Sequence, residues 1–232
     1  MSGAPSLADA RQNRLLAALA DSDWDRVSQH LEPVFLSSGE TLYEVGLPRT
    51  HAYFPTTAIV SIECPTADGA STEIALVGRE GLVGIALFMG GRSRPSRGVV
   101  EAEGWAFRLA EQFLKEEFAR GGALQHLLLL YTQALLTLTA QTAVCYRFHA
   151  LEQQLCRWLL LTLDRSTSSE LRTTHEKVAL MLGVRREGVT EALGRLQQSG
   201  LIHCGRGHIT VLDRAGLEGR CCECYGVVKR EF

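Results

Sequence analysis

The sequence predicts an α+β protein built from an N-terminal β jelly-roll barrel, a long helix and a C-terminal winged helix–turn–helix. Short strand-like runs separated by turn residues fill residues 33–109, which is typical of an antiparallel barrel. An unbroken helical pattern follows over residues 123–146. Two short helical segments joined by a glycine turn then lead into two short strands. The predicted domains are residues 1–122, 123–147 and 148–232.

The first of these domains should begin with helices. Residues 11–31 place leucine, tryptophan and valine at helical spacing, and Asp21 or Ser22 could cap a second short helix. From about Pro33 the pattern changes to runs of apolar and β-branched residues, such as residues 58–62 and 73–77, divided by Gly-containing turns. Several short strands at this spacing predict the barrel.

The long helix has more apolar surface than a single contact covers. A short helix over residues 111–120 should end at Gly121-Gly122, and the long helix should follow it. Apolar or small residues form one stripe on this helix, at alternating spacings of four and three positions, as in a heptad seam. This stripe packs either on the barrel or on a second copy of the chain. Four further leucines lie outside that stripe: Leu127, Leu129, Leu130 and Leu136. We predict a homodimer with the stripe at its interface: Leu124, Leu128, Tyr131, Leu135, Leu138 and Thr142.

Composition limits the class of protein. Apolar residues make up 46% of the 232 residues and the net charge is −2, which excludes a uniformly basic nucleic-acid coat. The charge is uneven, because residues 147–232 hold 13 Lys and Arg against 10 Asp and Glu. No run approaches the roughly 18 apolar residues of a membrane span, and no secretory signal is apparent. We therefore expect a cytoplasmic protein with no membrane partner and with reduced cysteines.

Residues 174–212 carry the most specific pattern. Thr174 can cap a short helix that should stop at Gly183, and a second helix should end at Gly200. Residues 201–204 and 208–212 alternate as strands around Gly205-Arg206-Gly207. Together they predict a helix–turn–helix followed by a small hairpin, or wing.

The outward face of the second helix has the residue types that read DNA bases in the major groove. Arginine forms a two-pronged contact with guanine, and glutamate accepts from cytosine. The alternative is an ordinary solvated helix face. We predict DNA contacts by Arg185, Arg186, Glu187, Thr190, Glu191 and Arg195. Lys177 in the first helix and Arg206 on the wing are candidates for phosphate contacts.

These segments resemble the Crp/Fnr family of bacterial transcription regulators. The resemblance rests on residues 182–193, Leu196 and residues 200–202 in the winged helix, and on residues 39–43, 53–55 and 79–84 in the barrel. It implies a homodimer that binds a palindromic site on double-stranded DNA, with RNA polymerase as a further partner. It also places Arg186 and Glu187 where the family reads bases. Glu191 departs from the family, in which many members have arginine, so the preferred half-site should not be copied from relatives.

The resemblance leaves the barrel's ligand open. Cyclic-AMP-binding relatives hold the phosphate with Gly-Glu and a later Arg-Ser pair, whereas this chain has Arg-Glu-Gly and an inverted Ser96-Arg97. Cyclic AMP is therefore not expected. Another small effector or a pocket filled by the barrel's own side chains are the alternatives. The candidate effector residues are Glu80, Gly81, Arg94 and Arg97.

Other functions fit the sequence less well. No nucleophile elbow, P-loop, zinc-protease motif or dinucleotide fingerprint is present, so we expect no enzyme activity. The tail motif of Cys221, Cys222 and Cys224 lacks the Cys-x2-Cys spacing of a zinc knuckle. We expect a reduced tail with no metal and no cofactor. The alternative to a DNA-binding regulator is a small-molecule-binding or redox-sensing protein in which the barrel is the main functional part.

Overall fold

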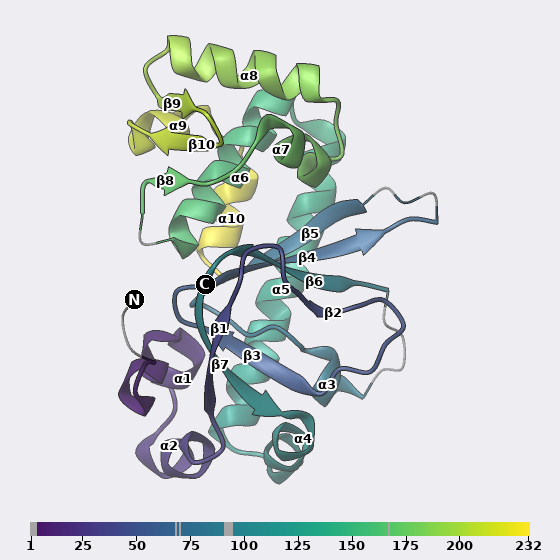
Figure 1. Ribbon diagram of the computed structural model, residues 1–232, viewed down its shortest axis with the longest axis vertical. Helices are drawn as coiled ribbons and strands as arrows, with labels where there is room; N and C mark the ends of the chain where they lie inside the picture. The colour runs from purple at the N-terminus through teal and green to yellow at the C-terminus, as the bar shows by residue number, and fades with distance from the viewer. Residues whose placement is uncertain (1–3, 68, 70, 91–94, 167) are drawn as a thin grey trace. The chain divides into compact units, whose positions relative to one another are not determined.

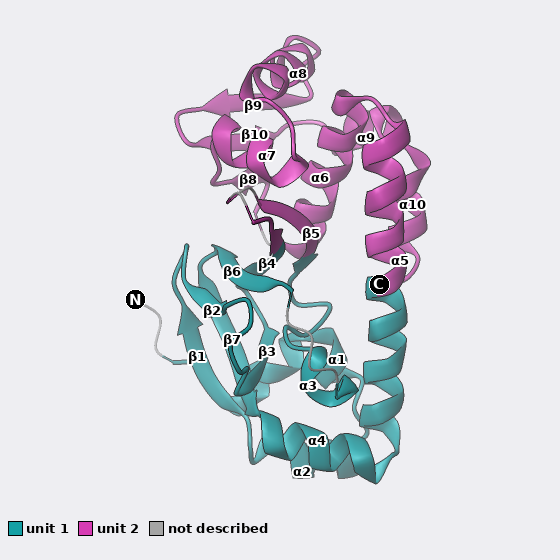
Figure 2. Ribbon diagram, turned by 90° about the vertical axis from the view of Figure 1, so that its right-hand side faces the viewer, with its two compact units in different colours: residues 1–63, 76–135 teal, residues 64–75, 136–232 magenta. Residues whose placement is uncertain are grey.

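The computed structural model describes residues 4–67, 69, 71–90, 95–166 and 168–232 (Figure 1). The chain divides into two compact units (Figure 2). Unit 1 comprises Met1–Glu63 and Leu76–Leu135, and unit 2 comprises Cys64–Ala75 and Leu136–Phe232. The boundary therefore crosses the long helix α5 (Ala123–Phe148) near its middle, and residues 64–75 are grouped with the C-terminal residues. The domain limits proposed from the sequence stay a prediction.

Short helices open unit 1, as predicted, and a buried asparagine holds them to the barrel. They are η1 (Leu7–Gln12), α1 (Arg14–Ala17) and α2 (Asp21–Ser28). The Asn13 Oδ1 accepts from the N–H groups of Leu15 and Leu16, which caps α1. Its Nδ2 donates to the carbonyls of Pro55 and Gly81 at 2.9 and 2.8 Å. Because these bonds satisfy the side-chain amide, Asn13 can be fully buried without a large desolvation penalty.

The barrel of the predicted fold class is confirmed. Its strands are β1 (Glu32–Leu36), β2 (Thr41–Tyr43), β3 (His51–Pro55), β4 (Ile59–Pro65), β5 (Ser71–Val77), β6 (Arg97–Ala102) and β7 (Gly104–Ala110). One sheet has the order β1-β7-β3 and the other β2-β6-β4-β5, with antiparallel pairing of β7 to β1 and β3 and of β6 to β2 and β4. Side chains from both sheets form one apolar core: Leu36, Tyr43, Val60, Val77, Val100 and Ala106.

Three helices, α3 (Ala86–Met89), α4 (Glu111–Arg120) and α5, complete this part of the chain. The bounds of α4 are those predicted, since Gly121 and Gly122 adopt φ angles of 82° and 91° that other residues avoid. α5 starts as predicted and extends to Phe148. By length and composition alone α5 is apolar enough to cross a membrane, a test that core helices of soluble proteins also pass.

Unit 2 carries the winged helix–turn–helix, also as predicted. Its elements after α5 are α6 (Leu151–Arg165), β8 (Glu170–Leu171), α7 (His175–Leu182), α8 (Arg186–Gln198), β9 (Ile202–Gly205), β10 (His208–Val211), α9 (Arg214–Arg220) and α10 (Glu223–Lys229). Leu155, Leu159 and Leu193 are fully buried and form part of its core. β8, α9 and α10 were not predicted from the sequence. Two residues are too few to show strand periodicity, and the glycines in α9 and α10 weaken the helical signal.

Candidate nucleic-acid interface

Local signals in the sequence build the helix–turn–helix. The Thr174 Oγ1 accepts from the N–H of Lys177 at 3.2 Å and caps α7. α7 ends at Gly183, whose φ of 65° and ψ of 35° lie in the left-handed region. α8 then turns one face inward, as predicted, and buries Val189, Ala192, Leu193 and Leu196. The opposite face of α8 is left for solvent or a partner.

That outward face carries the six side chains predicted to contact bases, and all six are exposed. They are Arg185, Arg186, Glu187, Thr190, Glu191 and Arg195. The Arg186 Nε lies 3.8 Å from the Glu176 Oε2, and the two side chains are 65% and 76% exposed. An ion pair this exposed stabilises a protein by less than about 1 kcal/mol. The guanidinium of Arg186 can therefore leave Glu176 for a stronger acceptor.

Thr190 is tied to the first helix by a contact that the sequence analysis missed. The Thr190 Oγ1 donates to the Arg186 carbonyl at 3.0 Å. The His175 Nδ1 lies 3.0 Å from that Thr190 hydroxyl oxygen. His175 occupies the first position of α7, directly after the capping Thr174. The start of the first helix thus meets the first turn of the second. The signal available in the sequence was the cap, which fixes where α7 begins.

Arg195 makes an ion pair within the chain, and its predicted DNA contact stays a prediction. Its Nε donates to the Glu152 Oε2 at 2.9 Å, and the Arg220 Nη1 donates to the other oxygen of the same carboxylate at 3.2 Å. The hydrogen bond from Arg195, supported by Arg220, lowers the pKa of Glu152. Arg195 therefore fastens α8 to α6. The sequence could not show this, because Glu152 lies 43 residues away.

An Arg195→Ala variant should lower the free energy of unfolding by up to about 1 kcal/mol, the range of partly exposed ion pairs. The base preference of any DNA that it binds should be unchanged. Urea denaturation and binding to a panel of duplexes measure the two effects. Glu152→Ala removes the partner of both Arg195 and Arg220, so it should lower the free energy of unfolding at least as much and likewise leave the base preference unchanged. Loss of preference at one base position in Arg195→Ala would instead support the predicted DNA contact.

The predicted wing is present. β9 and β10 pair antiparallel, and β8 adds a third strand beside β10. A Cβ atom on Gly205 would lie 2.0 Å from the ring of His208, so the histidine fills the space over that glycine. Gly207 has a φ of 79°. Between them Arg206 is exposed at the tip of the turn, as a phosphate contact requires, whereas Lys177 on α7 is partly buried.

Comparison with known proteins identifies this arrangement. Residues 153–220 match the Crp-like helix-turn-helix domain family. A CRP/FNR-family transcriptional regulator from Thermus thermophilus shares 25% identity with a TM-score of 0.67, and the match covers 82% of this chain and 97% of that one. The chain therefore carries a Crp-like helix–turn–helix domain and is similar to Crp/Fnr-family regulators over most of its length.

Other Crp/Fnr structures share the fold at lower identity. A crp/fnr-family regulator from Eubacterium rectale has a TM-score of 0.71 and 17% identity, over 90% of this chain and 98% of that one. FixK2 from Bradyrhizobium japonicum has a TM-score of 0.70 and 16% identity, over 83% of this chain and 98% of that one. No curated protein sequence matches at a significant level. The resemblance to the family that the sequence analysis stated is confirmed.

In the barrel, the candidate effector residues make contacts within the chain. The Glu80 Oε1 accepts from the N–H of Gly78 at 3.2 Å, and Glu80 is buried. The Arg97 Nε and Nη2 lie 2.9 and 2.8 Å from the Glu63 Oε2. Arg94 lies outside the described residues. Among the alternatives left by the sequence, these contacts favour a barrel whose ligand region is occupied by its own side chains.

Gly81 supports the same interpretation, because the ring of Tyr131 takes the space of a side chain. A Cβ atom at Gly81 would lie 2.2 Å from the Tyr131 Cε2 and 2.3 Å from its Cζ. Tyr131 is 3% exposed. The α5 helix thus places an aromatic ring directly over the Arg-Glu-Gly turn.

A Gly81→Ala variant should lose about 1–3 kcal/mol of folding free energy, because a buried ring must move to admit the methyl group. Urea denaturation measures the loss. Gly219→Ala is the control, since no atom lies within 4 Å of its added Cβ. Adding Tyr131→Leu to Gly81→Ala should restore part of the stability. An unchanged midpoint in Gly81→Ala would show that Tyr131 does not pack on this turn.

The residues of the predicted dimer seam on α5 are largely buried within the single chain, and the seam itself stays a prediction. Leu124, Leu128, Tyr131, Leu138 and Thr142 are all at most 8% exposed without any partner, and Leu135 is partly buried. That stripe is an internal face. A second stripe with the same steps of four and three is exposed, and we call it the exposed stripe: Leu129, Gln133, Leu136, Ala140 and Ala143. Leu130 and Val144, which are 54% and 41% exposed, border it.

Proposed function

We propose that this protein is a transcription regulator that binds a palindromic site on double-stranded DNA as a homodimer, with α8 in the major groove. One observation carries the proposal. An intact Crp-like helix–turn–helix presents the exposed residues Arg185, Arg186 and Glu187 at the start of its second helix. The first turn of a recognition helix is where such motifs contact base edges.

Roles for the other side chains follow from their position and chemistry. Arg186 bonds guanine through both prongs of its guanidinium, and Glu187 accepts from a cytosine amine. Thr190 and Glu191 lie further along the same exposed face. Arg206 on the wing binds a phosphate, which fixes the register of the protein without reading sequence. Lys177 is a second phosphate contact.

A homodimer explains the apolar surface of α5. The exposed stripe would place large side chains such as Leu129 and Leu136 in water in a monomer, at 49% and 61% exposure. Its heptad spacing suits pairing with the same helix of a second copy. A two-fold dimer binds two half-sites about one helical turn, or roughly 34 Å, apart.

The regulatory part of the proposal concerns the barrel. A signal acting there changes DNA binding only if it favours one of two dimer states. The packing of Tyr131 on Gly81 and the pairing of Arg97 with Glu63 argue against cyclic AMP as that signal. The protein acts in the cytoplasm, with RNA polymerase as its further partner.

Selection from a random duplex pool tests this function. Purified full-length protein is mixed with the pool at moderate salt, with and without cyclic nucleotides, and the retained DNA is sequenced. We expect a palindrome in the sample without nucleotide, and a binding constant that falls steeply with added salt. A palindrome recovered only with a cyclic nucleotide would overturn the inference about the barrel. Failure to enrich any motif would contradict a DNA-reading function in the absence of a signal.

A further inference from the structure

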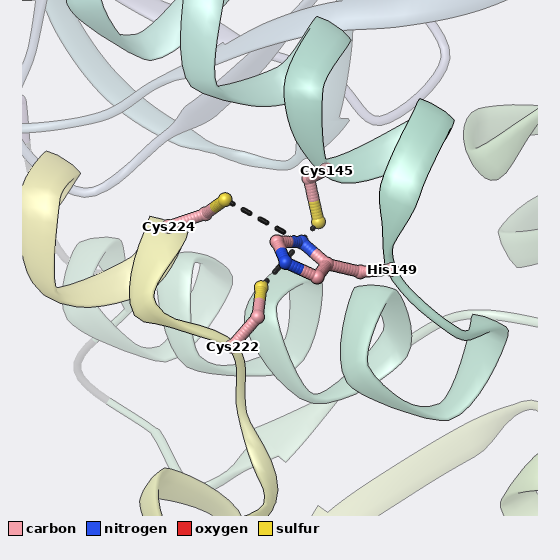
Figure 3. A group of neighbouring side chains, drawn as sticks. All are labelled: Cys145, His149, Cys222 and Cys224. Atoms are coloured by element: carbon pink, nitrogen blue, oxygen red, sulfur yellow. Dashed lines mark hydrogen bonds between the residues drawn. The ribbon is translucent and has the colours of Figure 1, made fainter.

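Four potential metal ligands from two distant segments meet in unit 2 (Figure 3). Cys145 belongs to the last turn of α5 and His149 follows its end, while Cys222 and Cys224 belong to the start of α10. Their ligand atoms all lie within 4.8 Å of one another. Cys145, Cys222 and Cys224 are buried and His149 is partly buried. We call this group the Cys3His cluster.

Simple backbone geometry explains how the cluster forms. Residues four apart share one face of a helix, so Cys145 and His149 project in the same direction. Cys222 occupies the N-cap of α10 in an extended conformation, and Cys224 lies in the first turn. The two segments are far apart in sequence, since Cys222 follows Cys145 by 77 positions. The spacing of cysteines within the tail therefore does not determine whether a metal site can form, because two of the four ligands come from the end of α5.

Two of the distances in the Cys3His cluster match those between ligands of one ion. In a tetrahedral zinc site with Zn–S bonds of about 2.3 Å and Zn–N bonds of about 2.0–2.1 Å, two sulfurs are about 3.8 Å apart and a sulfur and a nitrogen about 3.6 Å. Here the Cys145 Sγ lies 3.6 Å from the Cys222 Sγ, and the Cys224 Sγ lies 3.6 Å from the His149 Nδ1. In an iron–sulfur cluster each thiolate binds a different iron atom, which spreads the ligands further apart.

The histidine is oriented as a ligand. Its Nε2 lies 3.3 Å from the Glu223 Oε1, and its Nδ1 lies 3.6 Å from the Cys224 Sγ. The neutral tautomer with its proton on Nε2 would donate to that carboxylate and leave the Nδ1 lone pair for a metal. Metal-bound histidines commonly donate their second N–H to a carboxylate in this way. The Gln154 Nε2 donates to the His149 carbonyl at 2.8 Å and steadies the backbone at the end of α5.

A buried positive charge lies close enough to act on the cluster. Arg157 is 4% exposed, its Nη2 donates to the Thr142 Oγ1 at 2.7 Å, and no carboxylate of the described residues pairs with it. Its Nε is buried without a hydrogen-bond partner among those residues. Three thiolates and one divalent ion carry a net charge of −1, which would balance this guanidinium.

We propose that Cys145, His149, Cys222 and Cys224 bind one Zn²⁺ ion in a closed four-coordinate site. On binding, the ion displaces the protons of the three thiols, and the imidazole stays neutral. No position is left for water or substrate, so the site is structural and fastens α10 to the end of α5. This proposal does not depend on DNA binding.

Metal analysis of the wild-type protein is the first test. Full-length protein purified under reducing conditions should contain one zinc per chain by mass spectrometry. After removal of zinc with a chelator, Co²⁺ should bind at one equivalent and give the intense charge-transfer and visible bands of tetrahedral thiolate coordination. Added Zn²⁺ should abolish those bands. Neither measurement needs a variant that folds.

Substitutions assign the ligands. Cys145→Ser and Cys222→Ser should each reduce the zinc retained against a chelator by at least tenfold. Cys64→Ser and Cys204→Ser are the matched controls, because these cysteines lie outside the cluster, and they should keep one zinc. The proposal is overturned if the wild-type protein has no tight Zn²⁺ or Co²⁺ site, if it contains iron with sulfide, or if the cluster variants retain zinc as the controls do.

Discussion

Replacing Arg186 with alanine should weaken binding to the preferred operator by about 1–3 kcal/mol for each half-site. At 1.4 kcal/mol per factor of ten, that is roughly 5- to 150-fold. The reason is the exposed position of the guanidinium at the start of α8, where its ion pair with Glu176 is loose. A homodimer carries the change in both half-sites, so the loss applies twice on a palindrome. Fluorescence anisotropy with labelled operator measures it.

The pattern of the loss identifies what Arg186 contacts. A panel of operators with single base changes should show that the variant no longer distinguishes one base position, while discrimination at the other positions persists. Arg186→Lys keeps the charge but not the two-pronged contact, so it should lose the same discrimination with a smaller loss of affinity. Equal weakening on every duplex, with all base preferences intact, would make Arg186 a phosphate contact.

Replacing Leu136 with aspartate should dissociate the homodimer and remove tight operator binding. Leu136 lies in the middle of the exposed stripe and is 61% exposed in the single chain. Two symmetry-related carboxylates in an apolar seam would lose their hydration without gaining a partner, which costs several kcal/mol. Sedimentation or light scattering should give a mass near 25.5 kDa in place of twice that value.

Two further variants separate dimer loss from misfolding. Leu47→Asp puts the same change at a leucine that is 58% exposed outside α5, and it should leave the dimer intact. Leu135→Asp changes the internal stripe, so it should lower the thermal unfolding temperature. A dimeric mass for Leu136→Asp would place the interface elsewhere on the chain.

The parts of the fold predicted correctly are those encoded locally. Gly121, Gly122 and Gly183 end helices because of their own backbone preferences, and the inward face of α8 follows from its helical spacing. The two faces of α5 show where prediction from local sequence signals stops. Both have heptad spacing, and only the packing of the whole chain determines which is internal. The stripe with more large apolar residues was predicted to form the dimer interface, whereas in the structure it is largely buried within the single chain.

The site residues also divide into those whose exposure depends on one helix and those whose contacts come from distant segments. Exposure of Arg186 and Glu187 could be predicted from the helical wheel, since it depends on α8 alone. The role of Arg195 could not, because Glu152 approaches from α6. The Cys3His cluster has the same origin, since two of its ligands come from a helix that the tail reaches only in the folded chain.

The exposed stripe of α5 also changes in size along its length. Leu129 and Leu136 lie at its N-terminal end and its middle, and Ala140 and Ala143 follow toward its C-terminal end. In a symmetric pair, leucines hold two helix axes further apart than alanines do, because the axis distance depends on the side chains at the contact. Two such helices would converge toward their C-terminal ends. The volume of the side chains at positions 140 and 143 would then set the separation of the paired helix ends, and a larger residue there would act as a spacer.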